Sequence, residues 1–246
     1  MNRKLHDLSA NVQTEHRILE EGVREVSELK AVLLDIDGTL IDSNDAHARA
    51  WVDVGKEFGH DVDFNHVRWL IGMGGDKVLP AVTGLQEESP RGEQILHRRG
   101  EIFRERYLPQ LKAFEGARAL LEQMAGDGLK LVVATSASEE DLQALLEQAG
   151  IRDLIDRAAN SDDAEESKPA PDIVQAALQR GRVNPGEAVM IGDTPYDIGA
   201  AQQAGVPIIG FLCGGWEAEE LRGAIALYEG PADLLARYSS SVLRKK

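Results

Sequence analysis

Two aspartates one residue apart close an apolar run near the start of the chain. The stretch AVLLDIDGTL places Asp35 and Asp37 directly after four apolar residues. Carboxylates this close repel each other, and burying both without a positive partner is costly. A hard divalent cation with oxygen ligands, such as Mg²⁺, removes that cost. Because Asp and Gly also form turns, the pair alone indicates only a candidate metal site.

Polar side chains also follow two later apolar runs. LKLVVATS ends with Thr135 and Ser136, and AVMIGD ends with Asp193. In an open α/β sheet, ligands bind beyond the carboxyl ends of the strands. We therefore expect these side chains to lie with Asp35 in one crevice. Three carboxylates there favour a Mg²⁺ site that keeps open positions for phosphate oxygens.

A lysine in a separate loop supplies a cation for this crevice. Lys168 lies in ESKPAPD, ahead of a helical pattern, and two prolines stiffen the loop. It is placed to pair with Asp35 and to meet phosphate oxygens, together with the Thr135 hydroxyl and the Ser136 backbone amide. Cations and donors that neutralise equatorial phosphate oxygens promote phosphoryl transfer.

The elements that must position these residues alternate between strand and helix. The apolar runs, with VPIIGF as a fourth, are typical of strands buried on both faces of a parallel sheet. Helical patterns separate them, and Ser138 with Asp141 resembles a helix N-cap box. Glycines stand where helices should end, at Gly150, Gly181 and Gly205. This order predicts an α/β fold with a Rossmann-like parallel sheet core flanked by helices.

One segment interrupts the alternation. Between residues 43 and 112 there is no strand-like run, but there are helix-like stretches such as DAHARAWVDVGKEFG. We therefore expect a small α-helical cap over 43–112, inserted after the first strand, and a core over 30–42 and 113–246. Residues 1–29 are polar with a loose apolar stripe, which predicts an N-terminal helical arm. A surface arm and an oligomer contact both fit that stripe.

The composition limits the partners and the compartment. The chain has 246 residues, 43% of them hydrophobic, which is enough for a substantial core. Its net charge of −15 disfavours nucleic acid and anionic membranes as partners. A single cysteine, the lack of a membrane-spanning apolar run and the lack of a signal-peptide core predict a cytoplasmic protein, monomer or homodimer.

Taken together, four motifs resemble those of the haloacid dehalogenase-like (HAD) superfamily. DIDGTL, VVATS, SKPAPD and GDTPYD are similar to its four motifs in order and spacing, and the helical segment is similar to its small C1-type cap. The resemblance covers roughly residues 30–238. It implies an enzyme that hydrolyses a phosphoric monoester through an aspartyl-phosphate intermediate.

The resemblance also implies roles for single residues. Asp35 would be the nucleophile, and Asp37 the general acid and then the general base. Thr135 would bind the transferring phosphoryl group, and Lys168 would orient Asp35. Asp35, the main-chain carbonyl of Asp37 and the side chain of Asp193 would hold Mg²⁺.

Four further residues are candidates for supporting roles. Asp197 would hold metal-bound water or Lys168, although a carboxylate favoured by a helix N-terminus explains it equally well. His47, in HARAW, resembles a histidine that supports the acid aspartate in sugar-phosphate mutases, and a packing histidine fits as well. Arg68 and Lys77 flank GMGG and are candidates for contacting the leaving group, although such cations are more often solvated surface.

Asp37 decides the first branch within the superfamily. Dehalogenases lack an acid at that position because halide leaves without a proton, whereas an alkoxide needs one. The stretch RWLIGMGGDKVLPAV resembles phosphoglycolate phosphatase caps, so the leading prediction is a Mg²⁺-dependent phosphatase of a small phosphorylated metabolite. The alternative is a sugar-phosphate mutase similar to β-phosphoglucomutase. Glu139 and Glu140 argue against it, because mutases carry a lysine nearby and these carboxylates would repel a second phosphate.

Overall fold

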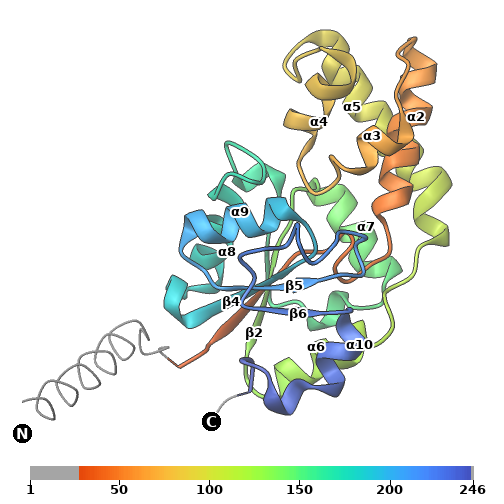
Figure 1. Ribbon diagram of the computed structural model, residues 1–246. Coiled ribbons are helices and arrows are strands. Elements are labelled where there is room, and N and C mark those ends of the chain that lie inside the picture. Colours follow the sequence, from red (N-terminus) through yellow and green to blue (C-terminus); the bar gives the residue numbers. More distant parts are fainter. Residues whose placement is uncertain (1–27, 245–246) are drawn as a thin grey trace, which may run out of the picture.

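A six-stranded parallel sheet forms the centre of the molecule (Figure 1). The computed structural model describes residues 28–244. The strand order is β3-β2-β1-β4-β5-β6, and every neighbouring pair is parallel. The α/β fold with a Rossmann-like parallel sheet is therefore confirmed. The strands are β1 (Ala31–Leu34), β2 (Lys130–Ala134), β3 (Arg157–Ala159), β4 (Ala188–Gly192), β5 (Ile208–Phe211) and β6 (Ala226–Tyr228).

Helices cover both faces of this sheet. Successive side chains of β1 point to opposite faces, so Leu33 packs into one hydrophobic cluster and Leu34 into another. Both residues are fully buried, which explains the continuous apolar run in the sequence. The Leu33 face is covered by α8 (Asp172–Gly181) and α9 (Pro195–Ala204), and the Leu34 face by α6 (Ala117–Gly126), α7 (Glu139–Gln148) and α10 (Pro231–Ala236).

The sequence patterns miss two strands and part of one helix end. Strands β3 and β6 have three residues each, which is too short to show a periodic pattern. Ser138 accepts a hydrogen bond from the Asp141 amide, so the predicted N-cap of α7 is confirmed. Helix α8 ends one residue later than its glycine suggests, because the left-handed position is Arg182 with φ 52°.

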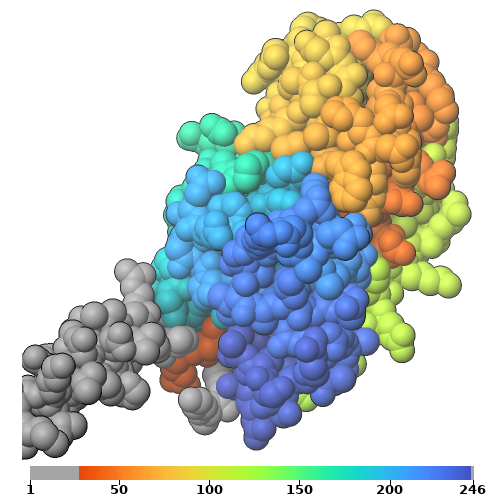
Figure 2. All heavy atoms as spheres, viewed as in Figure 1, coloured from red at the N-terminus to blue at the C-terminus, as the bar shows by residue number. Residues whose placement is uncertain are grey.

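A helical segment, residues 44–110, lies between β1 and β2 and stands as a separate lobe above the sheet (Figures 1 and 2). The chain enters and leaves it side by side, since Ile41 bridges Ala113 and the Asp42 amide donates to the Lys112 carbonyl at 3.1 Å. Its elements are α2 (Asn44–Phe58), α3 (Phe64–Arg68), α4 (Gly75–Thr83), α5 (Pro90–Ile102), the π-helical η1 (Phe103–Tyr107) and the 3₁₀ turn η2 (Leu108–Gln110).

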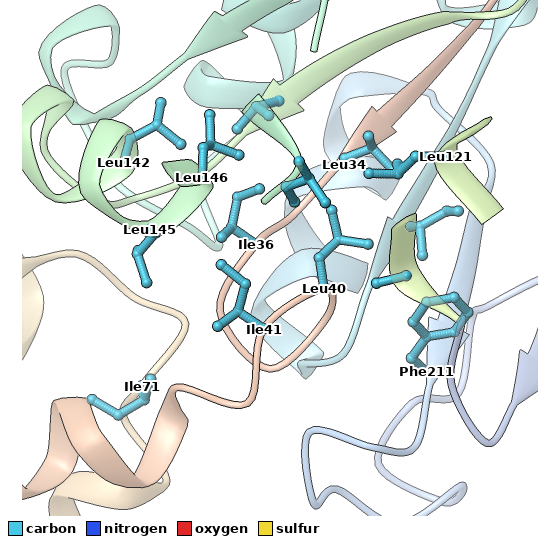
Figure 3. Packing of buried hydrophobic residues seen from close by; sticks show 14 of the residues in the cluster. Leu34, Ile36, Leu40, Ile41, Ile71, Leu121, Leu142, Leu145, Leu146 and Phe211 are labelled. Atoms are coloured by element: carbon cyan, nitrogen blue, oxygen red, sulfur yellow. The ribbon is translucent and has the colours of Figure 1, made fainter. Parts of the chain in front are cut away.

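Packing fixes the loop that follows β1. Ile36 is fully buried between the two aspartates, with Leu40 and Ile41 in the same cluster. Figure 3 shows these side chains beside Leu142 and Leu146 of α7. Burying the side chain between them leaves the two aspartates on the other side of the backbone, toward the carboxyl edge of the sheet.

Two expectations concern the N-terminal arm and membrane-spanning segments. The predicted helical arm over residues 1–29 falls, apart from its last two residues, outside the described range. Within residues 28–244, no helix is both long enough and apolar enough to cross a membrane.

Candidate active site

Side chains from the ends of three strands meet at the carboxyl edge of the sheet. Asp35 follows β1 and Thr135 follows β2, and both line a cavity of about 380 Å³ together with Asp37 and Ser136. Asp193 follows β4 and lies beside Asp35 in a group of buried carboxylates. The structure thus gathers residues that lie up to 158 positions apart in the sequence.

Three buried carboxylates lie together, and two of them pair with one lysine. Ligand oxygens of Asp35, Asp193 and Asp197 lie within 4.8 Å of one another. The Lys168 ammonium is fully buried, 2.5 Å from Asp35 Oδ1 and 2.8 Å from Asp197 Oδ1. The Thr39 hydroxyl lies 2.7 Å from Asp193 Oδ1 and 3.1 Å from Asp35 Oδ2. The cluster therefore holds three carboxylates and one ammonium, which pairs with Asp35 and Asp197.

Burial is the main cause of the raised carboxylate pKa values in this cluster, and the neighbouring carboxylates add to it. Burial raises the pKa of Asp35 to about 7, against the attraction of Lys168. Burial and the charge of Asp35 raise the pKa of Asp193 well above its ordinary value. Burial alone would lower the pKa of Lys168, yet Asp197 and Asp35 raise it. A divalent cation would supply the missing positive charge, and oxygen ligands of this kind suit Mg²⁺.

Two glycines leave room for the Asp193 carboxylate. A Cβ on Gly38 would lie 2.2 Å from Asp193 Oδ2, and one on Gly214 would lie 1.8 Å from the same oxygen. Gly38 also has φ 79°, which allows the chain to turn sharply after Asp37. Asn44 Nδ2 donates to Asp193 Oδ2 at 3.1 Å. The carboxylate is thus confined between two backbone segments.

Asp37 is held by a chain of side chains that starts in the helical segment. Its Oδ1 accepts from the Ser43 hydroxyl at 2.5 Å and lies 2.7 Å from His47 Nε2. The other ring nitrogen, Nδ1, contacts the guanidinium of Arg99, and the ring stacks on Phe103 at 4.0 Å. Since arginine stays protonated and donates, Nδ1 must accept and Nε2–H donates to Asp37. Burial alone would raise the pKa of Asp37, yet His47, Ser43 and Arg99 hold it below its ordinary value.

Two arginines of the helical segment reach across the cavity to the core. Arg99 of α5 donates to Asp141 Oδ2 at 3.1 Å, and Arg104 of η1 donates to Oδ1 at 2.6 Å. Arg104 also lies 3.1 Å from a Glu140 carboxylate oxygen. Asp141 is 3% exposed, so its charge is neutralised by these cations rather than by water.

The two hydroxyls after β2 are held in different ways. Thr135 Oγ1 accepts from the Ala137 amide at 3.1 Å, which leaves its own proton free to donate. Ser136 Oγ donates weakly to the Gly72 carbonyl at 3.4 Å, so its hydroxyl bridges to the helical segment. Both side chains remain part of the cavity wall.

Asp197 has both of the contacts that the sequence suggests. Its Oδ2 accepts from the Thr194 amide at 3.0 Å and the Thr194 hydroxyl at 2.6 Å, forming the capping box of α9. Its Oδ1 forms the ion pair with Lys168. A helix-capping role and a charge-balancing role therefore coexist in one side chain.

Arg68 and Lys77 do not line the cavity. Arg68 donates to Asp45 Oδ1 and to the Gly214 carbonyl, both at 2.7 Å. Lys77 donates to the Ser167 carbonyl at 2.8 Å. Both cations therefore attach the helical segment to loops of the core.

Several residues at the site carry no functional prediction from the sequence. The polar residues of DGTLIDSN, so close to Asp37, are a signal that was available. Arg99 and Asp141 are 42 positions apart on two separate helices, and no local pattern links them. The residues without a predicted role are Thr39, Ser43, Asn44, Arg99, Arg104 and Asp141.

The fold and this site define a hydrolase, and comparison with known proteins gives its family. The sequence model of the haloacid dehalogenase-like hydrolase family matches residues 32–211, so the chain belongs to that family. A phosphoglycolate phosphatase of Rhodospirillum rubrum is 31% identical over 218 residues, 83% of this chain and 89% of that protein.

Solved structures show the same architecture. A hydrolase from Pseudomonas syringae is 28% identical with a TM-score of 0.79, covering 86% of this chain and 98% of its own. CbbY from Rhodobacter sphaeroides, solved in complex with phosphate, is 28% identical with a TM-score of 0.73, covering 84% of this chain and 96% of its own. The chain is thus an enzyme of a hydrolase family with phosphatases among its relatives.

Proposed function

We propose that the protein is a Mg²⁺-dependent phosphatase that hydrolyses a small phosphomonoester through an aspartyl-phosphate intermediate. One observation carries the proposal: Asp35 lines the cavity while its Oδ1 is held by the buried ammonium of Lys168. A carboxylate fixed in this way faces a space the size of a small-molecule site, with Asp37 beside it. The phosphatase relatives support the reaction class.

Each residue then has a chemical role. Asp35 attacks phosphorus, and the bond to the leaving oxygen breaks while Asp37, in its protonated form, delivers a proton to that oxygen. Asp37 next takes a proton from the water that attacks the aspartyl-phosphate. Thr135, Ser136 and Lys168 bind the phosphoryl oxygens as negative charge develops on them.

The acidic cluster fits a resident magnesium ion. We assign Asp35, the Asp37 main-chain carbonyl and Asp193 as its ligands, because the cluster holds more carboxylates than cations and all its ligands are oxygens. When bound, the ion would neutralise these carboxylates and the phosphate oxygens. We assign residues 43–112 as a cap that covers the cavity, since Trp51, Leu96 and Arg99 of that segment line it.

The nucleophile is tested with Asp35→Asn. This variant should hydrolyse p-nitrophenyl phosphate at least about 10⁴-fold more slowly, because the amide cannot attack phosphorus. Asp61→Asn, at an exposed position, is the matched control and should keep normal activity. Turnover by Asp35→Asn within tenfold of the unaltered protein would refute the assignment.

The metal is tested by chelation. EDTA should remove activity and added Mg²⁺ should restore it, because the carboxylates repel the substrate phosphate when the cation is absent. Calorimetric titration of Mg²⁺ into the Asp193→Asn variant should show weakened binding. Full activity in EDTA would contradict the proposed site.

A sugar-phosphate mutase is the second candidate, and the 2.7 Å contact between His47 and Asp37 favours it. Glu140 argues against it, because it lines the cavity where a second phosphate would have to bind. Activation by a sugar bisphosphate, with phosphate retained on the product, would identify a mutase. Release of inorganic phosphate without such activation would identify a phosphatase.

A further inference from the structure

The cavity wall has two chemically different parts. One part consists of the proposed phosphoryl-binding residues around Asp35 at the sheet edge. The rest of the wall, which we call the leaving-group end, includes five carboxylates and two arginines: Asp76, Glu87, Glu140, Asp141, Glu165, Arg99 and Arg104. The balance of charge at this leaving-group end is therefore negative.

Both arginines are already paired within the protein. Arg99 is engaged by Asp141 and by His47 Nδ1. Arg104 is engaged by Asp141 at 2.6 Å and by Glu140 at 3.1 Å. Each guanidinium already faces a protein carboxylate, so an incoming anion would have to compete with one that is covalently in place.

Other cations do not compensate. Lys77 and Arg68 do not line the cavity, and both donate to backbone carbonyls, Lys77 to that of Ser167 and Arg68 to that of Gly214. His97 lines the cavity but lies 3.5 Å from Glu101, and both nitrogens of His47 have partners. Among the described residues of the cavity wall, the leaving-group end thus has no cation without an anionic or hydrogen-bonding partner.

Glu87 and Asp76, two of the remaining carboxylates, repel each other. Burial, Asp76 and Glu88 together raise the pKa of Glu87. Asp76 accepts from the Ser167 amide at 3.2 Å, which does not neutralise its charge. A third carboxylate of this end, Glu165, is exposed. A hydroxyl group can donate to carboxylates of this kind, whereas an anion cannot.

We propose that the substrate's leaving group carries no negative charge and donates hydrogen bonds, as the hydroxyl groups of a monophosphorylated polyol or sugar do. Esters whose leaving group carries a carboxylate or a second phosphate are poor substrates, because like charges then meet in a partly enclosed site. The inference rests on the proposed phosphatase function and names its substrate class. This substrate class separates the chain from the Rhodospirillum rubrum relative, whose name specifies phosphoglycolate, an ester whose leaving group carries a carboxylate.

The test uses two esters that differ in one group. Glycerol 3-phosphate and 3-phosphoglycerate share a three-carbon skeleton, with a hydroxymethyl group in one and a carboxylate in the other. With Mg²⁺ present, kcat/KM should be about tenfold or more higher for glycerol 3-phosphate. Equal values, or a preference for 3-phosphoglycerate, would overturn the proposal.

Variants locate the cause of the preference. Glu87→Gln should narrow the ratio between the two esters by about threefold or more, because it removes one repelling charge. Asp76→Asn should act in the same direction. Glu88→Gln is the control, since Glu88 is exposed and does not line the cavity, and it should change the ratio much less. If all three variants alter the ratio equally, the cavity charge is not its cause and the proposal fails.

Two more measurements separate the remaining possibilities. Phosphoethanolamine has a cationic leaving group, and the negative wall predicts that it is hydrolysed at least as well as glycerol 3-phosphate, whereas a kcat/KM as low as that of 3-phosphoglycerate would overturn the proposal. Hydrolysis of p-nitrophenyl phosphate reports on the phosphatase itself. If no ester is hydrolysed, the proposed function is refuted and this inference with it, whereas hydrolysis with the opposite charge preference refutes the inference alone.

Discussion

Charged residues follow different rules at the carboxyl edge of the sheet and in the helical segment above it. Asp35 and Asp193 come from strands far apart in the sequence and still meet, because neighbouring parallel strands end at one edge. Arg68 and Lys77 are both predicted to face the substrate, and both instead bind core loops, while Arg99 lines the cavity. In a parallel sheet, the place of a residue at the end of a strand predicts where its side chain lies. On a helix, which side chains reach the cavity depends on how the helix packs against its neighbours.

The largest effect should follow from breaking the sheet-edge cluster. Lys168→Met should lower the free energy of unfolding by about 3–5 kcal/mol without added metal, because two buried carboxylates lose their cation. Urea denaturation measures this loss, and Mg²⁺ should restore part of it.

Lys30→Met provides the matched control for that variant. Lys30 also lies 2.5 Å from a carboxylate, that of Glu187, but half of its side chain is exposed. Its loss should change stability little, because solvent screens such pairs. Equal destabilisation by the two variants would show that the buried ion pairs of Lys168 contribute no more to stability than the exposed pair of Lys30.

A smaller effect is expected where the two regions meet. His47→Asn should lower kcat/KM for an alkyl phosphate by about 10- to 100-fold, because Asp37 loses the donor that positions it for proton transfer. The loss should be smaller with p-nitrophenyl phosphate, since p-nitrophenolate leaves without a proton. His66→Asn, at an exposed position, is the control. Equal losses on both esters would exclude a role for His47 in leaving-group protonation.

The smallest effect should come from the helical segment alone. Arg68→Ala should lower kcat/KM by about tenfold at most, equivalent to one hydrogen bond of roughly 0.5–1.5 kcal/mol. The loss should be uniform across substrates, because Arg68 contacts the Gly214 carbonyl and does not line the cavity. A change in selectivity between two esters would instead show that Arg68 reads the leaving group, as its sequence context suggests.

The sequence predicts the sheet core because each of its four main strands is a continuous apolar run. Strands β3 and β6 escape detection because three residues at a sheet edge carry too little pattern. Asp35 and Asp193 converge because each follows a strand of the same parallel sheet, so their places in the sequence motifs also predict that they meet at one edge of the sheet.

Contacts such as that between Arg99 and Asp141 depend on how α5 packs against the core. Nothing within either helix specifies this packing, so neither residue is identifiable from periodicity. Thr39 illustrates an intermediate case. It lies within the first motif, but only the approach of β4 brings Asp193 to its hydroxyl.

The close approach of two glycines to Asp193 also limits which substitutions the chain can tolerate. Gly38 and Gly214 lie far apart in the chain, yet a methyl group at either position would collide with the same carboxylate oxygen. A saturation scan should therefore show two positions of low tolerance that share Asp193 as one cause, with Asn44 and the positive φ as further causes at Gly38. The shorter Ser at position 193 would not restore tolerance at either glycine, because its Cβ would still lie 2.6 Å from a methyl group at position 214 and Asn44 would still obstruct one at position 38.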